Sequence, residues 1–265
     1  MTTVVLQLAQ TLSTLCFGVL GMVVARHRGM PRVHRLAWTL TGVAFTVTGA
    51  HAVAQASFAA VAFTAGPGSA AWNTYLRWMP AGNDGRAFAV MGFGVALLYF
   101  VARGAAREPR PPWSYAAALA ACLLAGSWVG LAEGPFTPAM HFPVLTVIDA
   151  VALITLLAAL WLAAVHDTVD FLLWVALACY AAQEAVSVDL HYLASWLGTA
   201  GALHLWPGMP HAIGTATFAV MIGCALRRLL LARRGAQVPA LFHVFRGGAG
   251  GASAVPDAYP RIGRP

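Results

Sequence analysis

The chain contains no lysine, and only 9% of its 265 residues are charged. A soluble domain of ordinary composition carries about a quarter charged residues. The deficit therefore indicates a chain that is solvated by lipid, and 60% of its residues are hydrophobic. All 16 basic residues are arginines. The absence of lysine excludes a retinal protein, because retinal is held as a Schiff base to a lysine amine.

Recognisable catalytic motifs are also absent: the sequence has no HExxH, P-loop, GxSxG or strand-to-helix GxGxxG. This favours a non-enzymatic role. The four cysteines form no CxxC pair, and each falls in a different apolar segment. We expect them to be buried thiols that pack as small apolar groups, without a disulfide or a thiolate metal site. They are Cys16, Cys122, Cys179 and Cys224.

Long apolar runs, by contrast, fill most of the chain. A helix needs about 20 mostly apolar residues to span a bilayer, and seven segments meet or approach this length. They cover residues 4–24, 35–63, 86–101, 113–131, 143–165, 170–196 and 211–229. The sequence therefore predicts an all-α, multi-pass membrane bundle of seven helices over residues 1–234. Residues 235–265 are rich in Gly and Pro and are predicted to be a cytoplasmic tail.

The arginines predict the orientation of the bundle. Eleven lie in the turns after the first and third segments and in the stretch after the seventh, whereas Arg77 and Arg86 alone fall on the opposite side. Since cytoplasmic loops are enriched in basic residues, we expect the N-terminus outside and the C-terminus in the cytoplasm of a bacterial inner membrane. Arginines that flank apolar segments follow a topology pattern, and we expect no nucleic-acid binding despite the net charge of +7.

Local composition predicts further details. Residues 66–85 are expected to form an external loop in which residues 71–79 make a short interfacial helix that Pro80 stops. Gly42 and Gly49 in the second segment and Gly126 in the fourth are expected to allow close helix approach.

The segment 170–196 carries Glu184, Asp189 and His191 inside an apolar run. Ionisable groups are costly within a membrane, so they normally face the bundle interior, a partner or a water-filled cavity. We expect an outward-facing polar pocket between the second, fifth, sixth and seventh segments. Its predicted binding residues are His51, Asp149, Tyr180, Glu184, His191 and His211.

Four hypotheses fit such a cluster. The groups would fix helix register through buried hydrogen bonds, or a histidine would ligate a haem or chlorophyll metal while Glu184 accepts a hydrogen bond from its second ring nitrogen. Alternatively, Glu184, His191, His51 and His211 would form a zinc-type hydrolase site. The fourth hypothesis is proton-coupled transport through Glu184 and Asp149.

The run Arg26-His27-Arg28 to Arg35-Leu36-Ala37-Trp38, followed by a Gly/Ala-rich helix, resembles the membrane domains of some bacterial sensor proteins. The resemblance implies a cytoplasmic output domain, for which a 31-residue tail is too short, so a sensor would need a separate partner. We therefore predict an accessory or structural subunit of a larger membrane complex whose pocket holds a cofactor, pigment, quinone or lipid. The alternative is a membrane sensor or a metal-dependent enzyme that uses the Glu/His cluster.

Overall fold

The computed structural model describes residues 2–27, 29–103, 112–202 and 209–234. Within these ranges the chain forms seven α-helices and no strand. They are α1 (Thr2–Ala25), α2 (Arg32–Ala65), α3 (Ala70–Arg103), α4 (Pro112–Ala132), α5 (Pro138–His166), α6 (Phe171–Ala202) and α7 (Met209–Arg233). All seven are long and apolar enough to cross a membrane, which confirms the predicted all-helical membrane bundle. The predicted tail, residues 235–265, lies outside the described residues.

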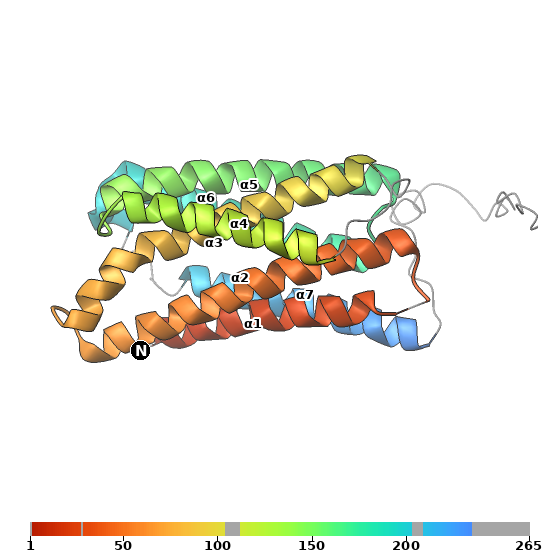
Figure 1. Cartoon of the computed structure of the whole chain (residues 1–265), viewed down its shortest axis with the longest axis horizontal. Coiled ribbons are helices and arrows are strands. Elements are labelled where there is room, and N and C mark those ends of the chain that lie inside the picture. Colours follow the sequence, from red (N-terminus) through yellow and green to blue (C-terminus); the bar gives the residue numbers. More distant parts are fainter. Residues whose placement is uncertain (1, 28, 104–111, 203–208, 235–265) are drawn as a thin grey trace, which may run out of the picture.

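Six of the helices form a closed ring. Each packs on the next in the order α1, α2, α3, α5, α6, α7 and back to α1, while α4 lies outside the ring against α3 and α2. The helices run roughly along one common axis, with the start of α1 at one end of the bundle (Figure 1). We call this the N-terminal end. The membrane-facing position of α4 agrees with its exposed side chains Trp113, Leu124 and Trp128.

Glycines set the close approach between helices, as the sequence predicts. A Cβ atom on Gly42 would lie 2.7 Å from the backbone nitrogen of Met22 in α1, and one on Gly49 equally close to the backbone nitrogen of Leu15. On Gly126 of α4, a Cβ would lie 2.4 Å from the carbonyl oxygen of Asp84 in α3. Side chains larger than hydrogen would therefore force these backbones apart.

The predicted external loop at residues 66–85 is wrong, because α3 begins at Ala70 and continues through Pro80 to Arg103. Proline removes one helical hydrogen bond, but membrane helices accept it where neighbours support the backbone. Pro80 is buried, and Gly130 of α4 packs directly on it, since a Cβ there would lie 2.4 Å from its carbonyl carbon. The N-terminal part of α3 is inclined more steeply than the rest (Figure 1). The polar residues before position 86 therefore belong to the bundle.

An aromatic cluster fills the centre of the ring around Phe45 of α2. Its ring meets those of Phe17, Phe93, Tyr180 and Phe218 edge-on, with centroids 4.8–5.8 Å apart. Such edge-to-face pairs add stability beyond the burial of their surface. Five helices are thus joined at one level of the bundle.

A buried ionic cluster lies toward the opposite end. The Trp38 Nε1–H of α2 donates to Asp170 Oδ2 over 2.6 Å, and Arg228 Nε of α7 lies 3.1 Å from the same oxygen. The other carboxylate oxygen accepts from the backbone N–H of Leu173 and so caps the start of α6. All three side chains are almost fully buried. Arg228 is one of the eleven arginines from which the orientation is predicted, and here it forms a buried ion pair with Asp170.

The cysteines differ in part from expectation. All four are free thiols, but only Cys224 is buried, whereas Cys16 is exposed and Cys122 and Cys179 are half-buried. The physical reason is that apolar residues on the outside of a membrane bundle face lipid, so an apolar segment does not identify its inward face.

Candidate functional site

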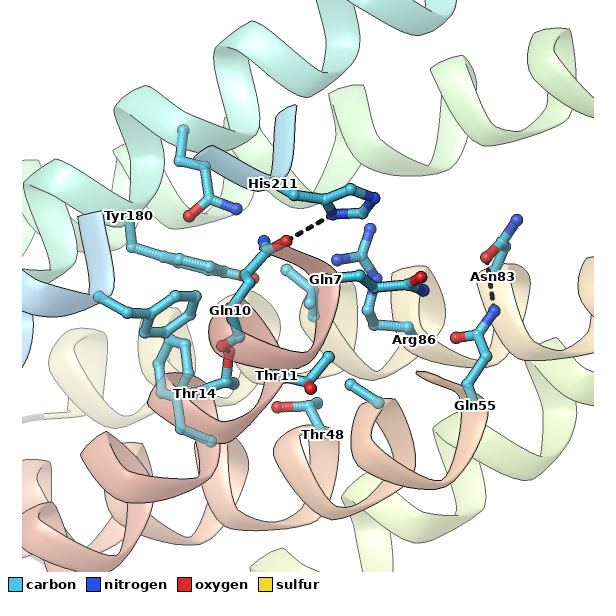
Figure 2. Close-up of a pocket in the computed structure, with 15 residues that line it drawn as sticks. Gln7, Gln10, Thr11, Thr14, Thr48, Gln55, Asn83, Arg86, Tyr180 and His211 are labelled. Carbon is cyan, nitrogen blue, oxygen red and sulfur yellow. Dashed lines mark hydrogen bonds between the residues drawn. The ribbon is translucent and has the colours of Figure 1, made fainter. Parts of the chain in front are cut away.

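A polar cavity of about 110 Å³ lies above the aromatic cluster, toward the N-terminal end. Helices α1, α2, α3, α6 and α7 contribute to its wall (Figure 2). The lining residues are Gln7, Gln10, Thr11, Thr14, Phe45, Thr48, Ala52, Gln55, Asn83, Arg86, Val90, Tyr180, Gln183, His211 and Phe218. Phe45, Tyr180 and Phe218 belong to the aromatic cluster as well, so the cavity rests on an apolar floor.

Neutral hydrogen-bonding groups dominate the wall. His211 Nδ1 and Gln10 Oε1 are 2.9 Å apart and join α7 to α1, while Gln55 Nε2 donates to Asn83 Oδ1 over 2.8 Å and joins α2 to α3. Figure 2 shows both bonds at the edge of the cavity. Gly214 makes room for Gln10, because a Cβ there would lie 2.1 Å from the amide nitrogen. The sequence thus places glycine where an amide side chain has to enter.

Arg86 is the one permanently charged side chain among the described lining residues. It enters from α3 beside Gln7 (Figure 2). Glu184 and Asp149 attract it electrostatically, yet no carboxylate of the described residues lies within 4.0 Å of its guanidinium nitrogens. Neither carboxylate lines the cavity. The cavity wall is therefore cationic at this point.

Two buried carboxylates, those of Asp149 and Glu184, lie next to the cavity without lining it. Asp149 of α5 is 2% exposed, and its Oδ2 lies 3.0 Å from Nδ1 of His191 in α6. Glu184 interacts electrostatically with Asp149 and His191, and Tyr180 lies one turn earlier on α6. The ring of Phe142 stacks on His191 at 5.6 Å. This cluster joins α5 to α6 next to the cavity.

The six predicted residues therefore divide into three groups. Tyr180 and His211 line the cavity, and Asp149, Glu184 and His191 form the adjacent cluster. The remaining residue, His51, lines a separate, mostly apolar groove between α2, α3 and α4, where its Nε2 lies 3.1 Å from the Gly82 carbonyl oxygen. The cavity also differs from the expected pocket in its walls: α1 and α3 contribute to it, while α5 does not.

Sequence reasoning missed Arg86, Asn83, Gln10 and Gln183 as site residues. The predicted loop at residues 66–85 includes Asn83, and the predicted third segment begins only at Arg86, because Pro80 is expected to stop a helix. Gln10 lies within the first predicted span, and this is a signal that could have identified it, since a glutamine inside a span needs a partner.

A second polar group lies at the N-terminal end, outside the cavity. Asp84 of α3, Glu133 of the turn after α4 and His141 in the first turn of α5 each offer a ligand atom within 4.8 Å of the others. Among the described residues this is the only such group of three. The side chains of the hypothetical zinc site do not form such a group: His211 lines the cavity, Glu184 and His191 belong to the adjacent cluster, and His51 lies in the groove.

The comparisons with known proteins give no family. No protein-family model matches the sequence, and neither the curated proteins nor the solved structures include a significant match. The functional argument therefore rests on the site itself.

Proposed function

We propose that the protein binds a small carboxylate in its membrane-embedded polar cavity, with Arg86 as the anion partner. The supporting observation is a guanidinium on the cavity wall that has no carboxylate within 4.0 Å among the described residues. A guanidinium binds a carboxylate through two parallel hydrogen bonds, which fits this chemistry better than any neutral ligand.

The size of the cavity restricts the ligand further. An apolar cavity of roughly 150 Å³ holds benzene, and this one measures about 110 Å³. A haem, chlorophyll or quinone needs a site of several hundred cubic ångströms, at about the usual 300–1,000 Å³ of ligand pockets. The cavity therefore favours a molecule of a few heavy atoms over the pigment or quinone expected from the sequence.

The neutral wall supports a ligand that also carries a hydrogen-bond donor. Gln183 is 6% exposed and lines the cavity, and its Oε1 has no hydrogen-bond partner. A buried amide oxygen without a donor is costly. A hydroxyl or amino group on the ligand would satisfy it. A short hydroxy acid such as lactate combines both features.

We also propose that the protein is an accessory subunit of a larger membrane complex. Ligand binding in the cavity would then influence the partner chains. The distribution of arginines supports the N-out orientation in a bacterial inner membrane. Purification in mild detergent tests the subunit role. We expect other membrane proteins to copurify with this chain, and a monodisperse single chain would contradict it.

Ligand binding is tested by calorimetry on the full chain in detergent with three matched probes: lactate, lactamide and propionate. We expect lactate to bind best, because lactamide lacks the charge for Arg86 and propionate lacks the hydroxyl for Gln183. The substitution Arg86→Gln should weaken lactate binding about 10- to 100-fold, as expected for about 1.5–3 kcal/mol from a charged hydrogen bond.

The matched control is Arg77→Gln, which removes an exposed arginine from the same helix and should leave binding unchanged. Equal affinities for lactate and lactamide, or an Arg86→Gln variant that binds lactate like the original chain, would contradict the proposal.

A further inference from the structure

Beyond ligand binding in the cavity, we propose that Asp84, Glu133 and His141 form a binding site for a divalent transition-metal ion such as zinc. The three side chains come from α3, the α4–α5 turn and α5. His141 Nδ1 lies 2.8 Å from Glu133 Oε2 and 3.7 Å from Asp84 Oδ1. One imidazole nitrogen and two carboxylates are a donor set that zinc accepts in proteins.

Unsatisfied carboxylate oxygens indicate that something is bound here. Asp84 is 0% exposed, and neither of its oxygens has a hydrogen-bond partner. Glu133 Oε1 is also buried and has no hydrogen-bond partner. Two neighbouring buried carboxylates repel each other, and each is costly to bury without a counter-charge. A dication would cancel both charges and supply a ligand bond to each group.

The side chains need only small rotations to hold the ion. Zinc bonds to nitrogen and oxygen are about 2.0–2.2 Å long, so the ligand atoms of a tetrahedral zinc ion lie roughly 3.3–3.6 Å apart. The candidate ligand atoms lie within 4.8 Å of one another. Changes of about an ångström in their separations are therefore sufficient. Glu133 is 17% exposed and provides the side from which an ion can enter.

The other ring nitrogen of His141 already has a polar partner. Asn83 Nδ2 lies 3.3 Å from His141 Nε2, and Gln55 donates to Asn83 Oδ1. A metal on Nδ1 requires a proton on Nε2, which then needs an acceptor. The Asn83 amide would therefore turn to present its oxygen, and the Gln55 amide would turn in response.

This amide pair also lines the polar cavity (Figure 2). Loading the metal site would thus exchange donors for acceptors on the cavity wall. The metal ion and the cavity ligand are expected to influence each other's affinity, and this reciprocal effect has a direct physical route through Asn83 and Gln55.

The test uses the full chain in detergent, stripped with a chelator and titrated with zinc chloride, with metal analysis of the washed protein. We expect one zinc ion per chain. Asp84→Asn and Glu133→Gln keep the side-chain shapes and should each weaken zinc binding by about 100-fold or more. Changes to residues that only hydrogen-bond a metal ligand weaken binding about 10- to 100-fold. Asp189→Asn, which alters an exposed carboxylate on α6, is the matched control and should bind normally.

Two variants of Asn83 separate a ligand shell from simple packing. Asn83→Asp supplies a permanent acceptor to Nε2–H and should tighten zinc binding, whereas Asn83→Leu removes the acceptor and should weaken it about 10-fold or more. A size-exclusion profile shows whether each variant is folded. If the buried Asp84→Asn variant does not fold, zinc binding is compared between the original chain and Glu133→Gln, whose side chain lies in a partly exposed turn.

Three results would overturn the proposal. One is a folded chain that retains no stoichiometric zinc. Another is zinc binding that survives both Asp84→Asn and Glu133→Gln. The third is an Asp84→Asn variant that is more stable than the zinc-loaded original, as expected if the two carboxyl groups merely share a proton. None of these results depends on lactate binding at Arg86, so the two proposals fail independently.

Discussion

The substitution Asp170→Asn should destabilise the bundle strongly, although it changes neither the size nor the shape of the side chain. Asp170 is 0% exposed and contacts Trp38, Arg228 and the backbone N–H of Leu173. An asparagine oxygen can still accept one of the N–H groups. It cannot neutralise the guanidinium of Arg228, which is 3% exposed and has no carboxylate other than Asp170 within 4.0 Å among the described residues.

The magnitude follows from burial. Removing one partner of a buried ion pair costs about 3–5 kcal/mol, because the other charge stays buried without compensation. We therefore expect Asp170→Asn to lower the free energy of unfolding by about 3 kcal/mol or more. The double variant Asp170→Asn/Arg228→Gln removes both charges. It should recover part of this loss, with a coupling energy of about 1–3 kcal/mol between the two sites.

The assay is unfolding in mixed micelles of mild detergent and increasing sodium dodecyl sulfate, followed by circular dichroism for the four chains of the double-mutant cycle. Arg227→Gln is the control, since the neighbouring arginine is exposed and should change stability little. The reasoning is refuted if Asp170→Asn lies within about 1 kcal/mol of the original chain, or if the double variant is less stable than both single variants.

Three further predictions concern packing, hydrogen bonding and orientation. Gly130→Ala should destabilise the contact between α3 and α4 by about 1–3 kcal/mol, because its Cβ would lie 2.4 Å from Pro80. The control is Gly223→Ala, whose Cβ would meet nothing within 4 Å. It should be neutral or slightly stabilising in the same unfolding assay. Trp38→Phe keeps an aromatic ring but loses the donor to Asp170, so we expect a loss of about 1.5–3 kcal/mol, and an unchanged midpoint would show that this hydrogen bond contributes nothing. A fluorescent protein fused to the C-terminus should fluoresce in the cytoplasm, while an N-terminal tag should be accessible once the outer membrane is removed. The reverse pattern would overturn the orientation inferred from the arginines.

Hydrophobicity explains why the fold class could be predicted from sequence. A span must be about 20 apolar residues long whatever its neighbours are, and the predicted segments fall within the seven helices apart from the one boundary residue Asp170. Gly42, Gly49 and Gly126 were likewise identified correctly, because small residues are needed wherever helix backbones touch. Pro80 misled the prediction, since the same residue that ends a helix in water is tolerated inside a bundle.

The site could be predicted only in part. The sequence showed that Glu184 and His191 need polar surroundings, because charge inside a membrane must be compensated. It did not show that Asp149 lies beside His191, or that Arg86 enters the cavity beside Gln7. Each of these contacts joins different helices. Along one helix, periodicity defines which residues share a face, but it carries no information about which helix stands opposite.

The amino-acid sequence alone therefore determined that this protein is a seven-helix membrane bundle with polar groups held inside it, because burial of apolar length in lipid is a local property of each segment. Only the tertiary structure decided that α1 and α3, rather than α5, line the cavity, and that Asp84, Glu133 and His141 meet outside it. The order of the helices around the ring determines both arrangements. That order results from side-chain packing between segments far apart in the chain, which no single segment specifies.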